Sequence, residues 1–340
     1  MGRLLARATE AVSLAHIRHV SAVPPRGAAT GVLRVYRQVE ADFGMLAPPV
    51  ALHAAAPDVL AACWSILRET TLARGTTSRP DRETVAAAVS AGNRCPYCVD
   101  IHGGTLAGLL RHPDATAVAA DLPDLVADPR RRDLARWARG AAGPPDSWPE
   151  LLPVALTFHY LNRMVNVFLQ DSPLPPGIGR ARRPAYRMAS WLLARLATDV
   201  PPGASGDLLP PAPLPDDLSW TADRPHIAGA VSRAAAVFEA AGERSVPAAV
   251  RALVRDRLAA APPGLDAGAW LRAALGGLPA RHRPVGRFTL LTAVASYRVT
   301  DQVVEDLRAA GSDDAALIDA AAWASWTAAR RVIAPLRAAA

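Results

Sequence analysis

Apolar residues recur every three or four positions along most of this chain. The clearest runs lie in residues 32–43, 56–67 and 231–238, where Val, Ala, Leu, Trp and Phe return at that spacing. Such spacing places the apolar side chains on one face of an α-helix. Alternating runs rich in β-branched residues are scarce, and the strong helix formers Ala, Leu and Arg are abundant. The pattern predicts an all-α protein.

Proline indicates where these helices end. The chain has 31 prolines, and they gather in clusters. Because proline inside a helix removes a hydrogen bond and clashes with the preceding turn, each cluster predicts a loop. The predicted loops are 24–25, 48–49, 144–153, 173–176, 201–215 and 262–263.

One Pro-rich segment divides the chain. Residues 199–220 are rich in Pro, Gly and Asp, a composition typical of a semi-rigid linker. We therefore predict a helical domain over 1–198, a linker over 199–220 and a second helical domain over 221–340. A length of 340 residues suits about two domains.

The two predicted domains resemble each other in one stretch. Residues 84–102 and 289–307 align without gaps, since both begin with Thr and share an Ala-Val pair at the fifth and sixth positions. An internal repeat would predict two copies of one helical unit packed face to face. Alanine-rich helices also align by chance, so duplication and coincidence both stay open.

The positive charge of the chain is spread out. There are 38 Arg and no Lys against 31 acidic residues, which gives a formal net charge of +7. Proteins that bind nucleic acids gather basic residues on one face, but the densest run here, residues 130–132, lies between Asp128 and Asp133. With five Phe and five Tyr, little aromatic surface is available to stack on single strands. The composition is typical of a GC-rich genome, and we expect no nucleic-acid partner.

Cysteine number and hydropathy exclude two further classes. Three cysteines are too few for the disulfide framework of a small secreted protein. Residues 1–20 contain Arg and Glu and no long apolar run, so they do not resemble a signal peptide. No stretch approaches the roughly 20 apolar residues of a membrane span. We expect a soluble, cytoplasmic protein with no membrane partner.

The stretch that indicates chemistry is Cys95-Pro-Tyr-Cys98, followed by His102. Residues three and four positions apart share a helix face, so the two thiols and the imidazole would form one stripe. Pro96 suits a first helical turn, which puts Cys95 at or near the N-cap, after a break at Gly92-Asn93. A helix N-terminus and a neighbouring imidazole both favour a thiolate. The stretch predicts a redox-active pair.

Two other interpretations of this motif stay open. Cys95, Cys98 and His102 could bind zinc with a fourth ligand, although structural zinc usually needs a second closely spaced pair, which the chain lacks. The two cysteines could also be core thiols, since free cysteine packs as a small apolar residue. Cys63, which precedes Trp64 in an apolar helix, is predicted to be such a core residue. We predict no metal and no cofactor.

A carboxylate could complete the set. Glu83 lies twelve residues before Cys95, about 18 Å away if one helix continued between them. If the chain turns at Gly92-Asn93 instead, two antiparallel helices bring Glu83 level with His102. Glu83 could then orient His102, or relay a proton through it to Cys98. Alternatively, Glu83 only caps the start of its own helix.

These residues carry a resemblance to a known family. Glu83, then Cys95-Pro-Tyr-Cys98 and His102, resembles the pattern of the alkylhydroperoxidase D-like branch of the carboxymuconolactone decarboxylase superfamily. Residues 159–166 also resemble a helix near the end of such domains. The resemblance implies an alkylhydroperoxidase D-like helical bundle, often oligomeric, and here with a second tandem copy that would be degenerate.

The resemblance also implies thiol-dependent hydroperoxide reduction. The residue matching Cys98 attacks the peroxide, the one matching Cys95 resolves the sulfenate as a disulfide, and those matching Glu83 and His102 form the proton relay. The implied partners are a hydroperoxide substrate and an external dithiol reductant, with a homo-oligomer as a further expectation. A carboxymuconolactone decarboxylase-like lyase and a non-catalytic, redox-sensing helical scaffold remain alternatives.

The chain departs from the family pattern in two ways. Tyr97 stands beside Cys98 where some peroxidases of the family have histidine, which bears on peroxidase efficiency. In the second half, the ungapped alignment replaces the four motif residues by Phe288, Thr300, Val303 and Leu307. If the second half is a copy, it is catalytically inactive and would supply the packing partner that a second subunit gives elsewhere.

Overall fold

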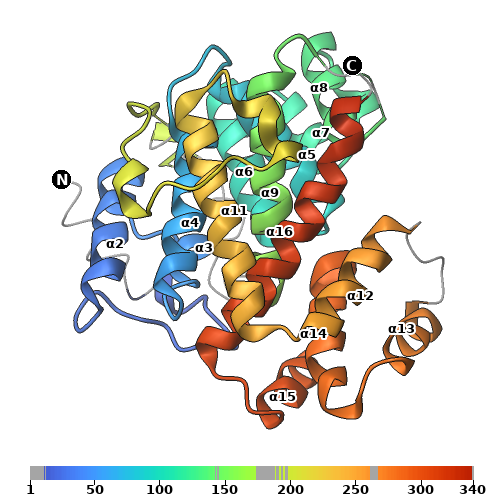
Figure 1. The fold of residues 1–340 in the computed structure, drawn as a ribbon. Helices are drawn as coiled ribbons and strands as arrows, with labels where there is room; N and C mark the ends of the chain where they lie inside the picture. Colours follow the sequence, from blue (N-terminus) through green and yellow to red (C-terminus); the bar gives the residue numbers. More distant parts are fainter. Residues whose placement is uncertain are drawn as a thin grey trace.

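The computed structural model describes residues 13–141, 145–173, 198–260 and 267–338, together with positions 11, 143, 188, 191, 192, 194 and 195. Apart from two isolated β-bridges, the regular structure of these residues is helical, which confirms the all-α prediction (Figure 1). The first half contains α2 (Thr30–Phe43), α3 (Pro48–Ala51), α4 (Pro57–Leu67), α5 (Arg79–Gly92), α6 (Pro96–Leu110), α7 (Asp114–Ala119), α8 (Pro129–Ala138) and α9 (Trp148–Phe168). The second half contains α11 (Pro225–Ser245), α12 (Ala248–Ala259), α13 (Ala267–Gly276), α14 (Arg283–Ala295), α15 (Asp301–Ala309) and α16 (Asp314–Ala338).

Short 3₁₀ and π segments join these helices. A π-helical turn, η1 (Arg68–Leu72), continues α4. The 3₁₀ segments are η2 (Pro123–Leu125), η4 (Gly206–Leu208), η5 (Asp216–Thr221), η6 (Ala280–His282) and η7 (Ser296–Arg298). The three apolar runs that predicted helices lie in α2, α4 and α11, as expected.

Several prolines begin helices instead of separating them. The predicted loop at 48–49 is wrong, because both prolines form the start of α3. The predicted loop over 144–153 is wrong from residue 148 onward, because α9 begins at Trp148 and includes Pro153. Proline is tolerated in a first turn, where its missing N–H has no intrahelical acceptor, and burial of α9 outweighs the bond lost at Pro153. The predicted loop at 262–263 lies outside the described residues, as do positions 174–176.

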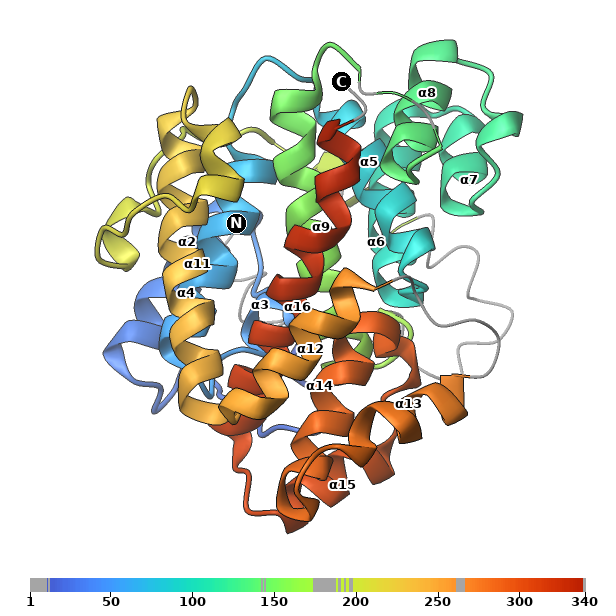
Figure 2. The same cartoon turned by 45° about the vertical axis from the view of Figure 1, so that its right-hand side comes forward.

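Helix α9 lies at the centre of the molecule. Every residue from Leu151 to Phe168 is buried, as expected for a helix enclosed on all sides. It packs against α5 of its own half and against α16 of the other half, and Figures 1 and 2 both show α9 beside α16. Helix α11 packs in turn against α4 and α16. The two halves therefore contribute to one hydrophobic core.

The Pro-rich segment 199–220 packs against the first half. Asp199 pairs with Arg82, and the Ser205 hydroxyl donates a hydrogen bond to the Glu69 carboxylate (2.8 Å). Leu218 of η5 is fully buried. The division into two domains stays a prediction. The same holds for the internal repeat, although α14 packs on α15 and α16 much as α5 packs on α6 and α9.

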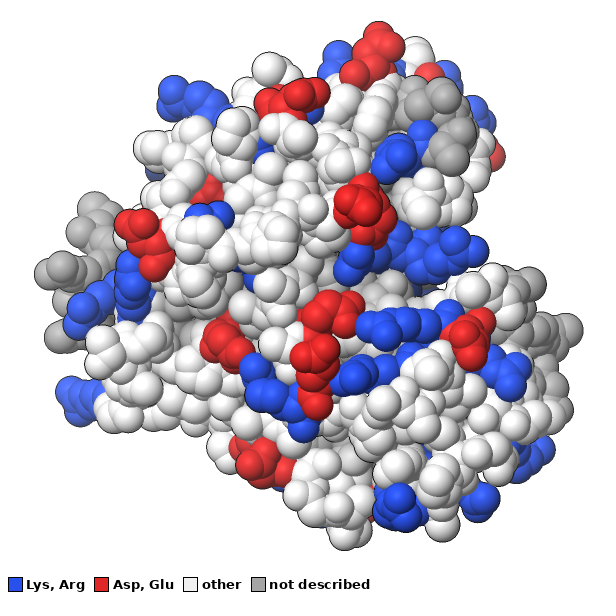
Figure 3. Space-filling view, in the orientation of Figure 1, with Lys and Arg blue, Asp and Glu red and all other residues white. Residues whose placement is uncertain are grey.

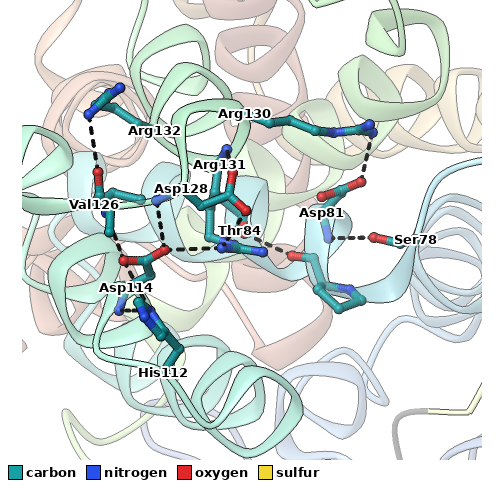
Figure 4. Close-up of polar contacts among 12 residues, drawn as sticks. Ser78, Asp81, Thr84, His112, Asp114, Val126, Asp128, Arg130, Arg131 and Arg132 are labelled. Carbon is teal, nitrogen blue, oxygen red and sulfur yellow. Dashed lines mark hydrogen bonds and ion pairs between the residues drawn. The ribbon is translucent and has the colours of Figure 1, made fainter.

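Arginines of the densest run, residues 130–132, form ion pairs within the fold. Arg131 at the start of α8 donates a hydrogen bond to the buried Asp114 (3.1 Å) and pairs with Asp128 (3.3 Å), while Arg130 reaches Asp81 (3.0 Å) (Figure 4). These contacts join α8 to α7 and to the first turn of α5. On the face shown in Figure 3, arginines and acidic residues are interspersed. Both observations agree with a positive charge that is scattered over the chain.

Candidate active site

Helices α5 and α6 form the antiparallel hairpin that we expected if the chain turned at Gly92-Asn93. Helix α5 starts after Ser78, whose hydroxyl accepts a hydrogen bond from the Asp81 amide (3.2 Å), so Glu83 does not cap it. The helix ends at Gly92, and Arg94 adopts the left-handed conformation (φ 51°) that reverses the chain. Cys95 is the N-cap of α6, as predicted, because Pro96 occupies its first position.

The hairpin brings Glu83 and His102 together. His102 Nδ1 lies 2.8 Å from Glu83 Oε2, and Arg79 Nε donates a hydrogen bond to Glu83 Oε1 (2.8 Å). The Glu83 side chain is 1% exposed. Burial alone would raise the pKa of Glu83, but Arg79 and His102 lower it to about 2 through their charges and hydrogen bonds. Glu83 is therefore ionised at neutral pH and bound by two basic groups.

The two cysteines of the motif form a disulfide, with their Cα atoms 5.4 Å apart. Cys95 is fully buried, and Cys98 is 4% exposed. Cys98 and His102, one helical turn apart on α6, both line a cavity of about 100 Å³. Cys95 is absent from the described lining of that cavity. Of the two sulfurs, that of Cys98 is therefore the one beside a space that a small molecule could occupy.

The cavity walls are mainly apolar and come from distant parts of the chain. Phe43 ends α2 and Met45 follows it, Leu67 and Leu72 lie around η1, and Phe158, Leu161 and Val165 project from α9. The Phe158 ring meets the His102 ring edge to face, with centroids 4.4 Å apart. A hydrocarbon chain or ring would be the natural occupant of such a space.

Arg79 also lines this cavity, and sequence reasoning did not select it. Its side chain is 9% exposed, and the described residues offer no acceptor to its Nη1 atom. Its position four residues before Glu83 was the available signal, because side chains at that spacing meet on a helix.

Tyr97, the departure from the family pattern, lines the same cavity as Cys98 and His102. Its ring contacts the His16 ring edge to face, with centroids 6.0 Å apart, and burial raises the pKa of its hydroxyl. Tyr97 therefore joins the N-terminal segment to α6 and stays neutral.

A buried amide network supports the turn before Cys95. The Asn93 side chain meets Asn162 Oδ1 (2.9 Å) and His159 Nδ1 (3.1 Å) on α9. Asn166, one turn further along α9, donates to the Asn93 carbonyl (3.1 Å) and to the Ser296 hydroxyl of η7 (3.0 Å). These residues lie in the stretch 159–166 that carried part of the family resemblance. Its side chains hold the redox turn and the second half together.

Comparison with known proteins identifies the family of the chain. The sequence profile of the carboxymuconolactone decarboxylase family matches residues 57–139. A protein named alkyl hydroperoxide reductase, from Mycobacterium tuberculosis, is 36% identical over 327 residues, which cover 93% of this chain and 94% of that protein. The chain belongs to the carboxymuconolactone decarboxylase family. Within it, the Cys-x-x-Cys motif assigns the chain to the alkylhydroperoxidase D-like branch. No solved structure matches the chain.

The family profile covers α4 to α8, and so includes Glu83, Cys95, Cys98 and His102. Helix α9 and the second half lie beyond it, but the mycobacterial relative spans both. Membership in the family and the named relative support a peroxide-reducing or carboxymuconolactone decarboxylase-like role, with an intact Cys-x-x-Cys pair.

Most of the other residues that the sequence analysis singled out are core residues. Cys63 is fully buried, and burial raises the pKa of its thiol, as predicted for a packing residue. In the second half, Phe288, Val303 and Leu307 are buried apolar residues. Among the described residues, no group of three or more His, Cys, Asp and Glu could hold a metal ion. In the same part of the chain, no helix combines the length and the hydropathy needed to cross a bilayer.

Proposed function

We propose that this protein is a thiol peroxidase that reduces hydrogen peroxide or an organic hydroperoxide with the Cys95–Cys98 pair. The observation that carries the proposal is the contact of His102 with Glu83. His102 lies one helical turn from Cys98, which lines an apolar cavity. The name of the mycobacterial relative supports the same class of reaction. The proposed location is the cytoplasm, where thiols are kept reduced.

In the proposed cycle, both cysteines begin as thiols. The Cys98 sulfur attacks the terminal oxygen of the hydroperoxide, the O–O bond breaks, and Cys98 becomes a sulfenic acid. The Cys98 thiol proton passes through His102 to the departing oxygen, which leaves as an alcohol or as water. The Cys95 thiol then condenses with the sulfenic acid, which forms the disulfide and releases water. An external dithiol returns the pair to thiols.

Glu83 and Arg79 are positioning residues in this proposal. With Glu83 ionised, His102 Nδ1 keeps its proton in the hydrogen bond to the carboxylate, and Nε2 is the nitrogen left to exchange a proton with Cys98. Arg79 holds the other oxygen of the same carboxylate and balances its charge in the buried site.

The apolar cavity favours an organic hydroperoxide over hydrogen peroxide. Its walls of Leu, Ile, Val and Phe can bury the carbon skeleton of an alkyl hydroperoxide beside Cys98. Hydrogen peroxide has no apolar surface to bury, so it would gain little from these contacts.

Turnover with dithiothreitol as the reductant tests the proposal. We expect many cycles with cumene hydroperoxide, none with Cys98→Ser, and a sulfenic acid trapped at Cys98 in Cys95→Ser. Activity in both variants equal to that of the wild-type protein would overturn the role assignment. A single oxidation without turnover would indicate the redox-sensing scaffold. Turnover of a lactone by Cys98→Ser would favour the lyase.

A further inference from the structure

An exposed tyrosine lies between two arginines at the redox turn. Tyr297 of η7 is 41% exposed. The guanidinium carbon of Arg94 lies 4.9 Å from the centre of its ring, and that of Arg298 lies 5.8 Å from it. Both distances fall within the range of cation–π attraction. We call these three residues the Arg94–Tyr297–Arg298 surface.

This surface includes the residue next to the buried disulfide. Arg94 immediately precedes Cys95 in the chain, and Pro96 immediately follows it. Arg94 and Pro96 are both exposed, whereas Cys95 between them is fully buried. The Cys95 backbone therefore passes just beneath the surface at this point. A protein bound here would lie beside the stretch of chain that carries Cys95.

The two halves of the chain are fixed to each other at this site. The Asn166 amide donates to the Asn93 carbonyl (3.1 Å) and to the Ser296 hydroxyl (3.0 Å), which are the neighbours of Arg94 and Tyr297 in sequence. The left-handed backbone of Arg94 also limits where its side chain can point. Arg94 and Tyr297, far apart in the sequence, are thus held as one preorganised patch.

Among the described residues, no carboxylate neutralises the positive charge of this patch. Neither Arg94 nor Arg298 has an ion pair with a described acidic side chain, whereas Arg82, Arg139 and Arg287 each have one. Asp301, the acidic residue next along the chain, pairs with His19 at 3.6 Å. Two unpaired guanidinium groups and one exposed aromatic ring are the residue types that dominate binding energy in protein interfaces.

We propose that the Arg94–Tyr297–Arg298 surface docks the reductant, and that the reductant is an acidic protein dithiol. The inference rests on the proposed function, because it concerns the step that restores the thiols. The arginines would attract carboxylates that flank the partner's thiols, and the tyrosine would supply apolar contact. Under this proposal, the second half, which lacks the redox motif, contributes the recognition surface of the site.

The step is a two-electron thiol–disulfide exchange. One thiolate of the partner attacks a sulfur of the Cys95–Cys98 bond, which forms a mixed disulfide and releases the other cysteine as a thiolate. The second thiol of the partner then attacks the mixed disulfide. The partner leaves with its own disulfide, and its two protons and two electrons end on Cys95 and Cys98.

Two synthetic peptide dithiols test this proposal. One carries four glutamates around a Cys-x-x-Cys, and the other carries four glutamines at the same positions. The protein is first oxidised with diamide, so that the test does not depend on peroxide chemistry. Its reduction is followed by alkylation and mass spectrometry of the tryptic peptide that contains both Cys95 and Cys98, which is longer in variants that lack Arg94. We expect the acidic peptide to reduce the wild-type protein at least about fivefold faster than the neutral one, and expect added salt to remove the difference.

Substitutions within the Arg94–Tyr297–Arg298 surface test whether it is the docking site. Arg94→Gln with Arg298→Gln should bring the ratio of the two rates close to one, Tyr297→Ala should lower it, and Tyr297→Phe should restore it. As a control, Arg272→Gln replaces an exposed arginine on α13, removes one positive charge away from this surface and should leave the ratio intact. Equal rates for the two peptides, or an unchanged ratio in the double variant, would overturn the proposal. The same rate advantage for 2-mercaptoethanesulfonate over 2-mercaptoethanol would also overturn it, since a small anion needs no docking surface. Loss of peroxide turnover with the ratio intact would instead count against the proposed function alone.

Discussion

His102 Nδ1 lies 2.8 Å from Glu83 Oε2, across the hairpin of α5 and α6. The contact joins residues on two antiparallel helices. Arg79 donates a hydrogen bond to the other oxygen of the Glu83 carboxylate. Because Glu83 is ionised and buried, it can hold the imidazole in one orientation and one tautomer. A proton relay to Cys98 requires this kind of fixed geometry.

Replacing Glu83 by Gln should slow the reaction with peroxide. The glutamine keeps the shape but loses the charge-assisted hydrogen bond to His102, so we expect kcat/KM for cumene hydroperoxide to fall about tenfold to a hundredfold. Steady-state kinetics with dithiothreitol measures the effect. The matched control is Glu243→Gln, an exposed glutamate on α11, which should match the wild-type protein. A Glu83→Gln rate within twofold of wild type would contradict the relay.

Glu83 should also make stability depend on pH. Its pKa falls from an ordinary value of 4.5 to about 2 on folding, so its contribution is complete above pH 4.5 and is lost as the pH falls through about 2. That contribution is about 3 kcal/mol. Urea unfolding of the reduced protein from pH 6 to pH 3 should show the gap between the wild-type protein and Glu83→Gln narrowing with acid. A gap that stays constant would show that Glu83 is not the group that titrates.

The cavity beside Cys98 should decide which peroxides react. Leu161→Trp would fill part of the space with a larger ring, so we expect kcat/KM for cumene hydroperoxide to fall about tenfold. The value for hydrogen peroxide, which does not need the apolar walls, should change less than twofold. Competition between the two peroxides on the same sample measures the ratio directly. Equal losses for both would mean that the cavity does not hold the substrate.

Asn166 should stabilise the redox turn. Asn166→Ala leaves the Asn93 carbonyl and the Ser296 hydroxyl without their shared donor, which should cost about 1–3 kcal/mol of unfolding free energy. The reduction potential of the Cys95–Cys98 pair should shift as well, because the turn before Cys95 loses its support. Ser296→Ala, which removes only one of the two contacts, should give a smaller change in both. An unchanged potential in Asn166→Ala would limit the residue to a packing role.

The hairpin could be predicted because its signals are local. Gly92-Asn93 marks the break, Pro96 marks the next helix start, and the near-equal spacing of Glu83 and His102 from that break makes them level. The same reliance on local signals explains why the loop predicted at Pro153 is wrong. Its cluster resembles a loop, but the tertiary burial of α9 overrides the local preference.

The cavity and the exposed surface could not be predicted from the sequence. Met45, Leu72 and Leu161 meet beside Cys98 only because three separate elements converge there. Likewise, no periodicity or motif connects Arg94 with Tyr297, since their contact depends on how α14 and η7 dock against α9. Local patterns determine helices and turns, whereas these contacts arise from packing between distant segments.

The central claim is that peroxide oxidises the Cys95–Cys98 pair from two thiols to a disulfide. The most direct measurement adds one equivalent of cumene hydroperoxide to the fully reduced protein and follows the tryptic peptide that runs from Cys95 to Arg111 by mass spectrometry. We predict that this peptide becomes lighter by two hydrogens, with one cumyl alcohol formed for each disulfide. Unchanged thiols in the presence of intact hydroperoxide would contradict the account.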